Sequence, residues 1–461
     1  MASVDALILG GGPAGATAAR LLAQWGHSVA IATGPATRHS MAECLPPSTH
    51  KVFRFLGIEE AVADAGFFRT EGNTVWWGGS RRRVEPYPEG SGYQVLRRDF
   101  DRLLLGLAEA AGARVLTGSA PRPRARFTLD CSGRAGVLAR AYRIRPGNAR
   151  TVALCGVWRS DAGWRLPDAS HTLVEAYGDG WAWSVPLSRT VRHVAFMVDP
   201  VETKLLRGRG LAPLYKAEFT KTRAFRRIFA RASMTSAPWG RDASPYTSRQ
   251  FSGPGFLLAG DAGSCIDPLS SFGVKKAMVS AWTGAVTAHT VLRKPEMREI
   301  ALRFFDERER QVYEGYRKQA SGWSRRAAME EAQPFWGSRG EFGEPAAAAA
   351  LDEARVRAAL QALREKPSIR LCRGDGVTTT RRAGIAGREV VLRDALLGPG
   401  AGESLDFIAN VDVCRLVEVA PHHRQVPDLF EAYNRAAAPV ELPHFLTALS
   451  SLVAAGVLVS L

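Results

Sequence analysis

The hydrophobic residues near the start of the chain follow the order strand, turn, helix, strand. A short apolar run at residues 6–9 precedes a Gly-rich turn, a helical stretch extends to Trp25, and a second strand-like run covers residues 28–33. Residues 256–259 form another apolar run, which leads into a helical stretch over residues 273–292. Because strands joined by helical crossovers show this alternation, the sequence predicts an α/β fold with a parallel sheet.

The middle of the chain changes to a period typical of strands. Residues 173–177, 181–186 and 191–198 are rich in β-forming residues, and turns at Asp179-Gly180 and residues 188–190 separate them. This pattern predicts an antiparallel meander. A meander cannot join a parallel sheet without long crossovers, so we expect it to form a second layer that faces the first, with the substrate between them.

The last part of the chain has a third pattern. Strand-like runs at residues 377–381 and 388–392 are followed by helical stretches at residues 411–419, 425–433 and 441–455. Strands followed by three short helices predict a small winged-helix-like domain. We therefore expect four segments: residues 1–160 with 240–295 as the first domain, 161–239 as the antiparallel-sheet substrate domain, 296–366 as a helical segment, and 367–461 as the winged-helix-like domain.

Length and composition narrow the class of protein. The 461 residues are 46% hydrophobic and 23% charged, which suits a globular chain of two or three domains. Six Cys without a C-x-x-C pair indicate reduced thiols in a cytoplasm rather than a zinc or disulfide framework. A Gly-rich loop that begins at Gly10 leaves no room for a signal peptide, and we interpret residues 445–461 as a buried terminal helix rather than a membrane span.

The charge is strongly positive but unevenly distributed. The chain has 61 Lys and Arg against 45 Asp and Glu, a net charge of +16. The part after residue 366, however, contains nine Arg, no Lys and ten acidic residues. The C-terminal domain therefore lacks the cations that nucleic-acid binding requires. The basic run over residues 303–326 is consistent with a solvated helix face or with a docking face for an acidic protein.

The first turn carries a glycine motif, Gly10-x-Gly12-x-x-Gly15, between a strand and a helix. Gly10 permits the tight turn, Gly12 allows backbone to approach a pyrophosphate, and Gly15 allows the helix to pack closely on the sheet. The motif predicts a Rossmann-like dinucleotide domain. The second strand ends at Thr33 instead of an acidic residue, so either Thr33 binds the ribose more weakly or the ribose is held from elsewhere.

Five motifs in order carry a family resemblance. They are the glycine loop, Glu43-Cys44-Leu45-Pro46-Pro47-Ser48, Arg97 within residues 95–101, Asp130-Cys131-Ser132-Gly133-Arg134, and Gly260-Asp261-Ala262 through residues 267–274. In this order the chain resembles FAD-dependent monooxygenases and halogenases of the p-hydroxybenzoate hydroxylase fold. The resemblance implies no metal and an FAD held by Gly10, Gly12, Pro13, Ala14, Gly15, Thr33, Glu43, Arg97, Gly260, Asp261, Pro268, Gly273 and Val274.

The physical roles of these residues agree with the resemblance. Asp261 would accept hydrogen bonds from the ribitol chain, and Arg97 would lie by the phosphates or the ring edge. Glu43 would lie by the adenosine ribose or the loop that faces it. The helix that begins near Gly273 would direct its N–H groups at the part of the flavin where negative charge collects on reduction.

The choice between halogenase and hydroxylase depends on one residue type. Trp181-Ala182-Trp183-Ser184-Val185-Pro186 resembles the W-x-W-x-I-P signature of flavin halogenases, which use a Lys after the E-x-L-P-P region. No Lys occurs between Lys51 and Lys204, and the corresponding neighbourhood, residues 69–80, has Arg instead. A guanidinium does not readily deprotonate, so hydroxylation is favoured. The catalytic residues stay unassigned; the candidates for the pocket wall are Trp76, Trp77, Trp181, Trp183 and Ser271.

The terminal domain suggests the substrate. Residues 368–461 resemble PqqD-like peptide-recognition domains, which capture a polypeptide by strand addition. A chain that combines this C-terminal domain with the flavin motifs resembles the monooxygenases that mature quinohemoprotein amine dehydrogenase. The resemblance implies that a flavin C4a-hydroperoxide hydroxylates a Trp side chain once or twice, with O₂ and with electrons from NAD(P)H or a reductase. The substrate would be a polypeptide, an acidic small-subunit precursor, and the product would serve tryptophylquinone biogenesis. The alternative is a flavin monooxygenase or halogenase that acts on a small or carrier-bound aromatic.

Overall fold

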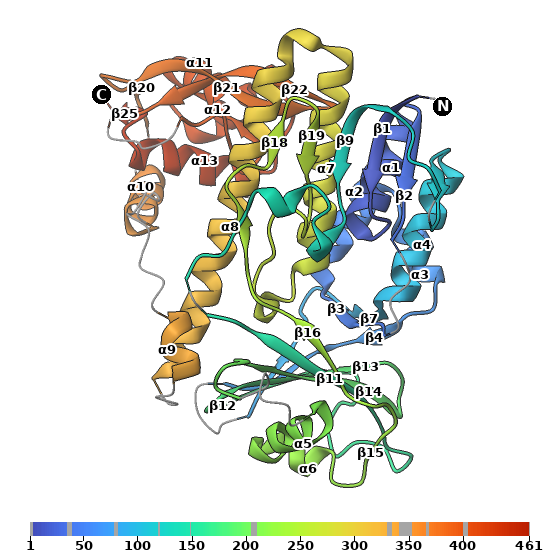
Figure 1. The fold of residues 1–461 in the computed structure, drawn as a ribbon. Coiled ribbons are helices and arrows are strands. Elements are labelled where there is room, and N and C mark those ends of the chain that lie inside the picture. The colour runs from blue at the N-terminus through green and yellow to red at the C-terminus, as the bar shows by residue number, and fades with distance from the viewer. Residues whose placement is uncertain are drawn as a thin grey trace. The chain divides into compact units, whose positions relative to one another are not determined.

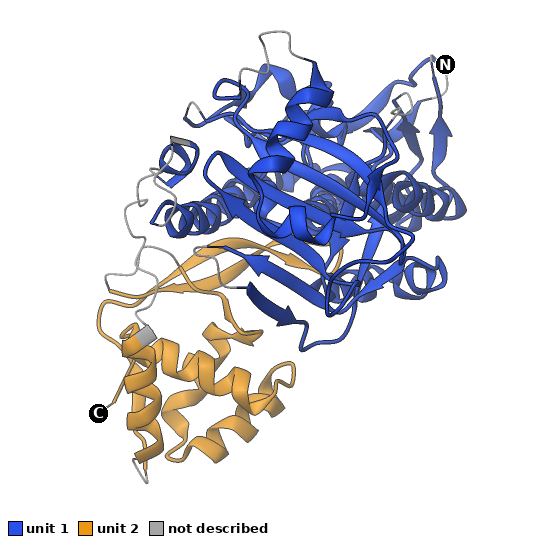
Figure 2. Cartoon of the chain, turned by 90° about the horizontal axis from the view of Figure 1, so that it is seen from below, with its two compact units in different colours: residues 1–342 blue, residues 343–461 orange. Residues whose placement is uncertain are grey.

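The structure, a computed structural model, divides the chain into two compact units, residues 1–342 and 343–461 (Figure 2). Three features of the sequence analysis lie outside the described residues: Lys204, the expected domain boundary at Pro367, and parts of the expected helical segment 296–366. The structure describes residues 3–34, 39–77, 82–118, 120–147, 149–203, 210–329, 334–340, 353–365, 368–399 and 404–460.

A six-stranded, mainly parallel sheet forms one half of unit 1 (Figure 1). Its central strand β1 pairs in parallel on both sides, with β2 and with β9, and only β18 runs antiparallel to its neighbour. Helices α1 and α7 pack against each other beside this sheet. The strand order is β18 (Ser252–Gly253), β19 (Phe256–Leu258), β9 (Ala125–Asp130), β1 (Val4–Leu9), β2 (Val29–Ala32) and β8 (Arg114–Leu116). The predicted Rossmann-like α/β fold is confirmed.

An eight-stranded sheet forms the other half of unit 1, and its long strands are antiparallel as predicted. The strand order is β15 (Ser233–Met234), β11 (Val152–Arg159), β14 (Val191–Val198), β13 (Gly180–Pro186), β12 (Thr172–Tyr177), β5 (Gly72–Trp76) and β6 (Arg82–Pro86), with β16 (Trp239–Asp242) beside β11. The antiparallel-sheet domain does not have the expected boundaries 161–239, because β5, β6 and β11 come from outside that range. Strand β5 joins by pairing in parallel with β12.

The two faces of this sheet bury different residues. One face packs on α5 (Leu211–Lys221) and α6 (Ala224–Ile228) through Phe196, Tyr215 and Phe225. The opposite face carries Trp181 and Trp183. It meets the segments around Ala42, Leu96 and Leu269, called the flavin-side loops below because FAD is predicted to lie beside them, and residues from α8 (Arg298–Ala328) and α9 (Pro334–Gly340). The second face is therefore the one on which a substrate pocket can form.

The remaining elements of unit 1 connect or cover these sheets. The three strands β3 (Ala42–Leu45), β7 (Gly92–Leu96) and β4 (Phe68–Thr70) form a small antiparallel sheet. Strands β10 (Arg143–Ile144) and β17 (Thr247–Ser248) pair with each other. The helices are α1 (Pro13–Gln24), α2 (His50–Leu56), α3 (Glu59–Asp64), α4 (Arg97–Ala110) and α7 (Gly273–Arg293).

Unit 2 has its own hydrophobic core, which includes Leu416, Tyr433 and Leu449. Its helices are α10 (Glu353–Glu365), α11 (Val413–Val419), α12 (Val426–Ala436) and α13 (Leu442–Ala454). Its strands are β20 (Leu371–Arg373) with β25 (Leu458–Ser460), β21 (Thr378–Ala386) with β22 (Glu389–Leu397), and β23 (Phe407–Ile408) with β24 (Val411–Asp412). None of the helices in the described part of the chain combines the length and hydropathy that a membrane crossing requires.

The fold of the first turn depends on a glycine that has no room for a side chain. A Cβ atom at Gly15 would lie 1.8 Å from the carbonyl oxygen of Gly10. We expect Gly15→Ala to displace the turn and to abolish FAD binding, as measured by retention of yellow cofactor on gel filtration. The matched control is Gly106→Ala in the exposed surface of α4, where an added Cβ meets nothing within 4 Å; this change should stabilise the protein by about 0.5–1 kcal/mol in urea unfolding. Cofactor retention by the Gly15→Ala variant would contradict the prediction.

Candidate functional site

The glycine loop brings a helix N-terminus against two other segments. Gly10 has φ of 102°, a left-handed conformation that favours glycine, and Pro13 is the first residue of α1. A Cβ at Gly10 would lie 2.5 Å from the carbonyl oxygen of Cys131, so the loop crosses the end of β9 without space for side chains. The N–H groups at the start of α1 have no side-chain cap, as a phosphate-binding helix terminus requires.

Arg97 lies beside this loop and joins two carboxylates. Its guanidinium donates to Asp101 Oδ1 at 2.9 Å and Oδ2 at 3.2 Å, and to Glu43 Oε1 at 3.5 Å. A Cβ at Gly12 would lie 3.6 Å from Arg97 Nη2. Burial lowers the pKa of Arg97, but the Asp101 and Glu43 carboxylates outweigh burial and raise this pKa overall. The structure thus brings Gly12, Glu43 and Arg97 together, with a permanent cation where the phosphates of a dinucleotide would lie.

The turn at Gly260 and Asp261 closes the other side of the same space. Gly260 has φ of 64°, and a Cβ there would lie 2.9 Å from the Cβ of Ala14. The segments around residues 10–15 and 260–261, far apart in sequence, therefore converge. Asp261 Oδ1 is buried and makes no hydrogen bond within the described residues. This acceptor, next to a turn that only glycine can form, fits a ligand that carries hydroxyl groups, such as the ribitol chain of FAD.

A buried lysine, which the sequence analysis did not identify, holds this turn. Lys276 Nζ donates to the carbonyl oxygen of Gly260 at 3.0 Å and to that of Ser264, and lies 3.8 Å from Asp261 Oδ1. The Ser280 hydroxyl accepts a hydrogen bond from the N–H of Gly260 at 2.8 Å. Lys276 follows Lys275 at the start of a helix, and no local pattern in the sequence indicates that its ammonium group is buried.

The loop before α7 contains a short turn with a side-chain hydrogen bond and ends at an uncapped helix. The Asp267 carboxylate accepts from the N–H of Leu269 at 2.9 Å, and a short turn covers Pro268–Ser270. Ser271 then adopts a left-handed φ of 54°. Helix α7 begins at Gly273 without a side-chain cap, and Val274 is buried. The N–H groups of Gly273 and Val274 thus follow a loop that fixes the direction of the helix.

Thr33 lies where the sequence places it, at the end of β2 and beside Gly11. Its hydroxyl donates to the carbonyl oxygen of Leu116 at 3.1 Å. The hydroxyl hydrogen is therefore engaged by the backbone, and only the lone pairs of the oxygen face a ribose. A ribose contact by Thr33 stays a prediction.

Three of the four predicted pocket tryptophans lie on one face. Trp77, Trp181 and Trp183 share one hydrophobic cluster, in which Trp77 packs edge to face on Trp181 at 6.3 Å between ring centroids. Trp76 packs into the cluster on the opposite face of the sheet, since consecutive residues at the end of β5 point to opposite sides. Ser271 lies in the loop before α7, outside the tryptophan cluster, while its neighbour Leu269 contacts it.

The same cluster contains aromatic residues that sequence reasoning missed. They are Trp239 from β16, Trp323 from α8, and Phe335 and Trp336 from α9. Trp336 packs on Trp77 at 5.0 Å and donates to the carbonyl oxygen of Tyr177 at 2.9 Å. Their positions more than 50 residues from Trp183 give no local signal of proximity. The face toward the flavin-side loops is therefore lined by indole rings.

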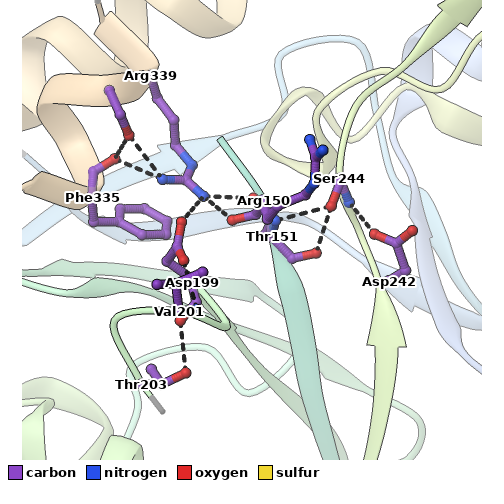
Figure 3. Close-up of polar contacts among 10 residues, drawn as sticks. Arg150, Thr151, Asp199, Val201, Thr203, Asp242, Ser244, Phe335 and Arg339 are labelled. Atoms are coloured by element: carbon purple, nitrogen blue, oxygen red, sulfur yellow. Dashed lines mark hydrogen bonds and ion pairs between the residues drawn. The ribbon is translucent and has the colours of Figure 1, made fainter. Parts of the chain in front are cut away.

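Arg339 fixes α9 against the sheet (Figure 3). Its guanidinium lies 3.7 Å from the centroid of the Phe335 ring and donates to Thr151 Oγ1 at 3.0 Å and to the Arg150 carbonyl oxygen. It also lies 3.6 Å from Asp199 Oδ2. Burial lowers the pKa of Arg339, while Asp267 and Asp199 oppose this effect. Arg339 is thus a buried cation close to the loop that precedes α7.

His193 is the second buried titratable group that the sequence did not reveal. It is fully buried on β14, and neither ring nitrogen has a partner within the described residues. The Nε1 atom of Trp239, whose ring centroid is 5.5 Å away, also has no partner there. Burial lowers the pKa of His193 to about 4, so the ring is neutral at pH 7. Alternation along β14 places it with Ala195 and Met197 on the tryptophan-lined face.

Comparisons with known proteins agree with this geometry. Residues 3–120 match the FAD binding domain family. A tryptophan 2-halogenase of Chondromyces crocatus is 31% identical over 323 residues, which cover 63% of this chain and only 62% of that protein. The solved structure of CmlS, a flavin-dependent halogenase, is similar with a TM-score of 0.78 at 21% identity over 100% of this chain and 96% of that chain. The peptidyl tryptophan dihydroxylase QhpG is similar with a TM-score of 0.66 at 21% identity, over 95% and 96% of the two chains.

The buried His193 predicts a pH dependence of stability. Its folded pKa of about 4 lies below the ordinary value of 6.5, so its contribution is present above pH 6.5 and is lost as pH falls toward 4. From pH 7.5 to pH 5 this loss amounts to about 2 kcal/mol. We expect His193→Phe, which keeps the ring, to lose about that much less stability than the wild type over the same interval. Urea unfolding at both pH values measures this, and equal losses in the two proteins would contradict it.

Proposed function

We propose that this chain, which carries an FAD-binding domain, is a flavin-dependent enzyme that hydroxylates a Trp side chain of a polypeptide precursor. The observation that carries the proposal concerns the segment where halogenases need a lysine. Here Arg69 lies 5.2 Å over the Tyr93 ring and donates to Ser91 Oγ at 3.0 Å. A guanidinium held in this way does not act as a nucleophile, and no Lys occurs between Lys51 and Lys204.

The tryptophan-lined face supports an indole as the reacting group. Bound FAD would supply the activation of O₂. Trp77, Trp181 and Trp183 would hold a flat ring and exclude water from it, because aromatic faces stack on one another in preferred offset or edge arrangements. Neutral His193 offers a ring nitrogen as an acceptor for the substrate N–H or for the proton that a hydroxylated ring loses. Two oxygens on one indole would require two rounds of reaction.

Unit 2 supports a polypeptide as the substrate. Among the described residues of this unit, β21 pairs with one strand, β22, over nine residues. An extended peptide can add to the other side of such a strand through main-chain hydrogen bonds. Arg381 on β21 is exposed, which favours an acidic peptide. This agrees with a precursor of an amine dehydrogenase small subunit as the partner, and the likeness in fold to a peptidyl tryptophan dihydroxylase is consistent with it.

A halogenase that acts on a small or carrier-bound aromatic is the second candidate. The 31% identity with a tryptophan 2-halogenase favours it, and this relative is nearer in sequence than QhpG is. The two candidates use the same cofactor but differ in the product, because halogenation requires halide and leaves a halogen atom on the ring.

The product of the reaction decides between the candidates. We expect the full-length protein, supplied with FAD, a flavin reductase, NADH and air, to add one or two oxygen atoms to an acidic peptide that contains Trp. Mass spectrometry and isotopically labelled O₂ would detect this addition, and chloride or bromide should not change it. Free L-tryptophan in the presence of bromide is the parallel reaction. A brominated product there, without oxygenation of the peptide, would establish the halogenase instead.

Deletion of unit 2 tests how the substrate is captured. A chain that ends at residue 342 retains the contacts of unit 1 and should still bind FAD with an unchanged visible spectrum. We expect its turnover of the peptide to fall about a hundredfold at low peptide concentration, since tethering supplies a gain of this order. Turnover of a small indole should persist at the level of the full chain. An unchanged KM for the peptide would show that unit 2 does not bind it.

A further inference from the structure

Helices α7 and α8 pack closely at one end and diverge at the other (Figure 1). At the closed end, a Cβ on Gly284 would lie 3.4 Å from the Phe305 ring. At the open end, Phe272 and Tyr316 are 5.9 Å apart between ring centroids. Between these points the two helices enclose a cavity of about 380 Å³, which lies within unit 1 and opens to the surface. This volume is large enough for a small organic molecule.

The wall of the cavity contains a buried carboxyl group, one oxygen atom of which has no hydrogen bond in the described part of the chain. Glu309 is 2% exposed, and its Oε2 atom has no hydrogen bond within the described residues. Burial raises its pKa, while Lys276 opposes this effect. Buried polar groups in folded proteins are normally paired. The Oε2 atom itself is closed off from solvent, so a ligand with an N–H or O–H group completes it only after the carboxyl group turns toward the cavity.

The mouth and sides of the cavity define the rest of the ligand. Lys275, which lies 5.1 Å over the Phe272 ring, and the exposed Arg308 line it, and the structure gives neither an ion-pair partner in the described part of the chain. Val279, Val312 and Tyr316 contribute apolar surface to the same cavity. The cavity thus combines one acceptor, apolar surface and two cations.

We propose that the cleft between α7 and α8 binds a small aromatic acid that carries an N–H or O–H donor, such as an indole or phenol carboxylate. The acid pairs with Lys275 and Arg308, the ring lies against Val279, Val312 and Tyr316, and the donor binds Glu309. This site is distinct from the tryptophan-lined face of the antiparallel sheet, and it does not depend on whether the enzyme hydroxylates or halogenates.

The walls of the cavity also contact the turn that would hold FAD. Ser280 lies between Glu309 and Gly260: it interacts with the carboxyl group and accepts from the Gly260 N–H at 2.8 Å. Lys276, which lines the same cavity, donates to the Gly260 carbonyl oxygen at 3.0 Å. A ligand that binds Glu309 therefore acts next to the two side chains that hold the N–H and the carbonyl oxygen of Gly260. Occupancy of the cleft is coupled to the flavin site through this turn, and the coupling is reciprocal.

The experiment titrates the FAD-loaded enzyme with indole-3-acetate and measures binding by calorimetry and by the visible spectrum of the flavin. We expect one binding event with a spectral change. Phenylacetate, which lacks the donor, and 3-methylindole, which lacks the acid, should each bind about tenfold more weakly, because a hydrogen bond or ion pair to a charged group is worth that factor. Equal affinity of all three compounds would overturn the proposal.

Variants locate the site. Arg308→Gln should weaken indole-3-acetate about tenfold and leave 3-methylindole unchanged, since the substitution removes the charge from an exposed side chain. Glu309→Met should weaken both indoles, while Glu309→Gln, whose amide oxygen still accepts, should restore binding. Arg303→Gln, an exposed substitution on the same helix that does not line the cavity, is the matched control. Wild-type affinity in the Arg308→Gln and Glu309→Met variants would place the compound elsewhere. Failure of oxygenation assays would leave these binding results unaffected.

Discussion

The close approach of backbone at three glycines is the constraint on which the site depends. Gly10, Gly15 and Gly260 each occupy a position where a Cβ atom would lie within 3 Å of another segment. These contacts set the distance between the start of α1, the end of β9 and the turn that precedes α7. Arg97 lies beside Gly12, and Asp261 directly follows Gly260, so both charged side chains lie near the point where these segments converge. The charge arrangement at the cofactor site is thus a consequence of absent side chains.

The antiparallel sheet adds a second constraint, which is alternation. Each strand presents successive residues to opposite faces, so only one of two neighbouring tryptophans can reach the flavin side. Trp77 reaches it and Trp76 does not. The face that results has little polar character: His193 and Trp239 contribute its unpaired nitrogen atoms in the described part of the chain. A ligand bound to a face of this kind would be selected by shape and ring stacking, with a small number of polar contacts to orient it.

The sequence predicted the parts of this protein whose signals are local. The glycine motif, the Gly260-Asp261 turn and the strands of the meander lie within a few residues of where the patterns indicated them. The sheet boundaries were harder, because β5 reaches the sheet by pairing in parallel with a strand about 100 residues later, and no periodicity encodes that partner. Lys276, Glu309 and His193 could not be identified either. Their burial is set by neighbours distant in sequence, whereas residue type alone suggests an exposed position for Lys276 and Glu309 and an intermediate one for His193.

The residues that cover the tryptophan-lined face are synthesised late in the chain, and this order has a consequence for folding during biosynthesis. The covering residues are among the last residues of unit 1 to be translated: Trp323, Phe335, Trp336 and Arg339. Until residue 340 has left the ribosome, Trp77, Trp181 and Trp183 lack the contacts that α9 makes with the tryptophan-lined face, and part of this apolar face is uncovered. Nascent chains in that state are prone to associate with one another. The yield of folded enzyme should accordingly depend on translation speed and chaperone supply over this short late segment, more than on the earlier nucleotide-binding half.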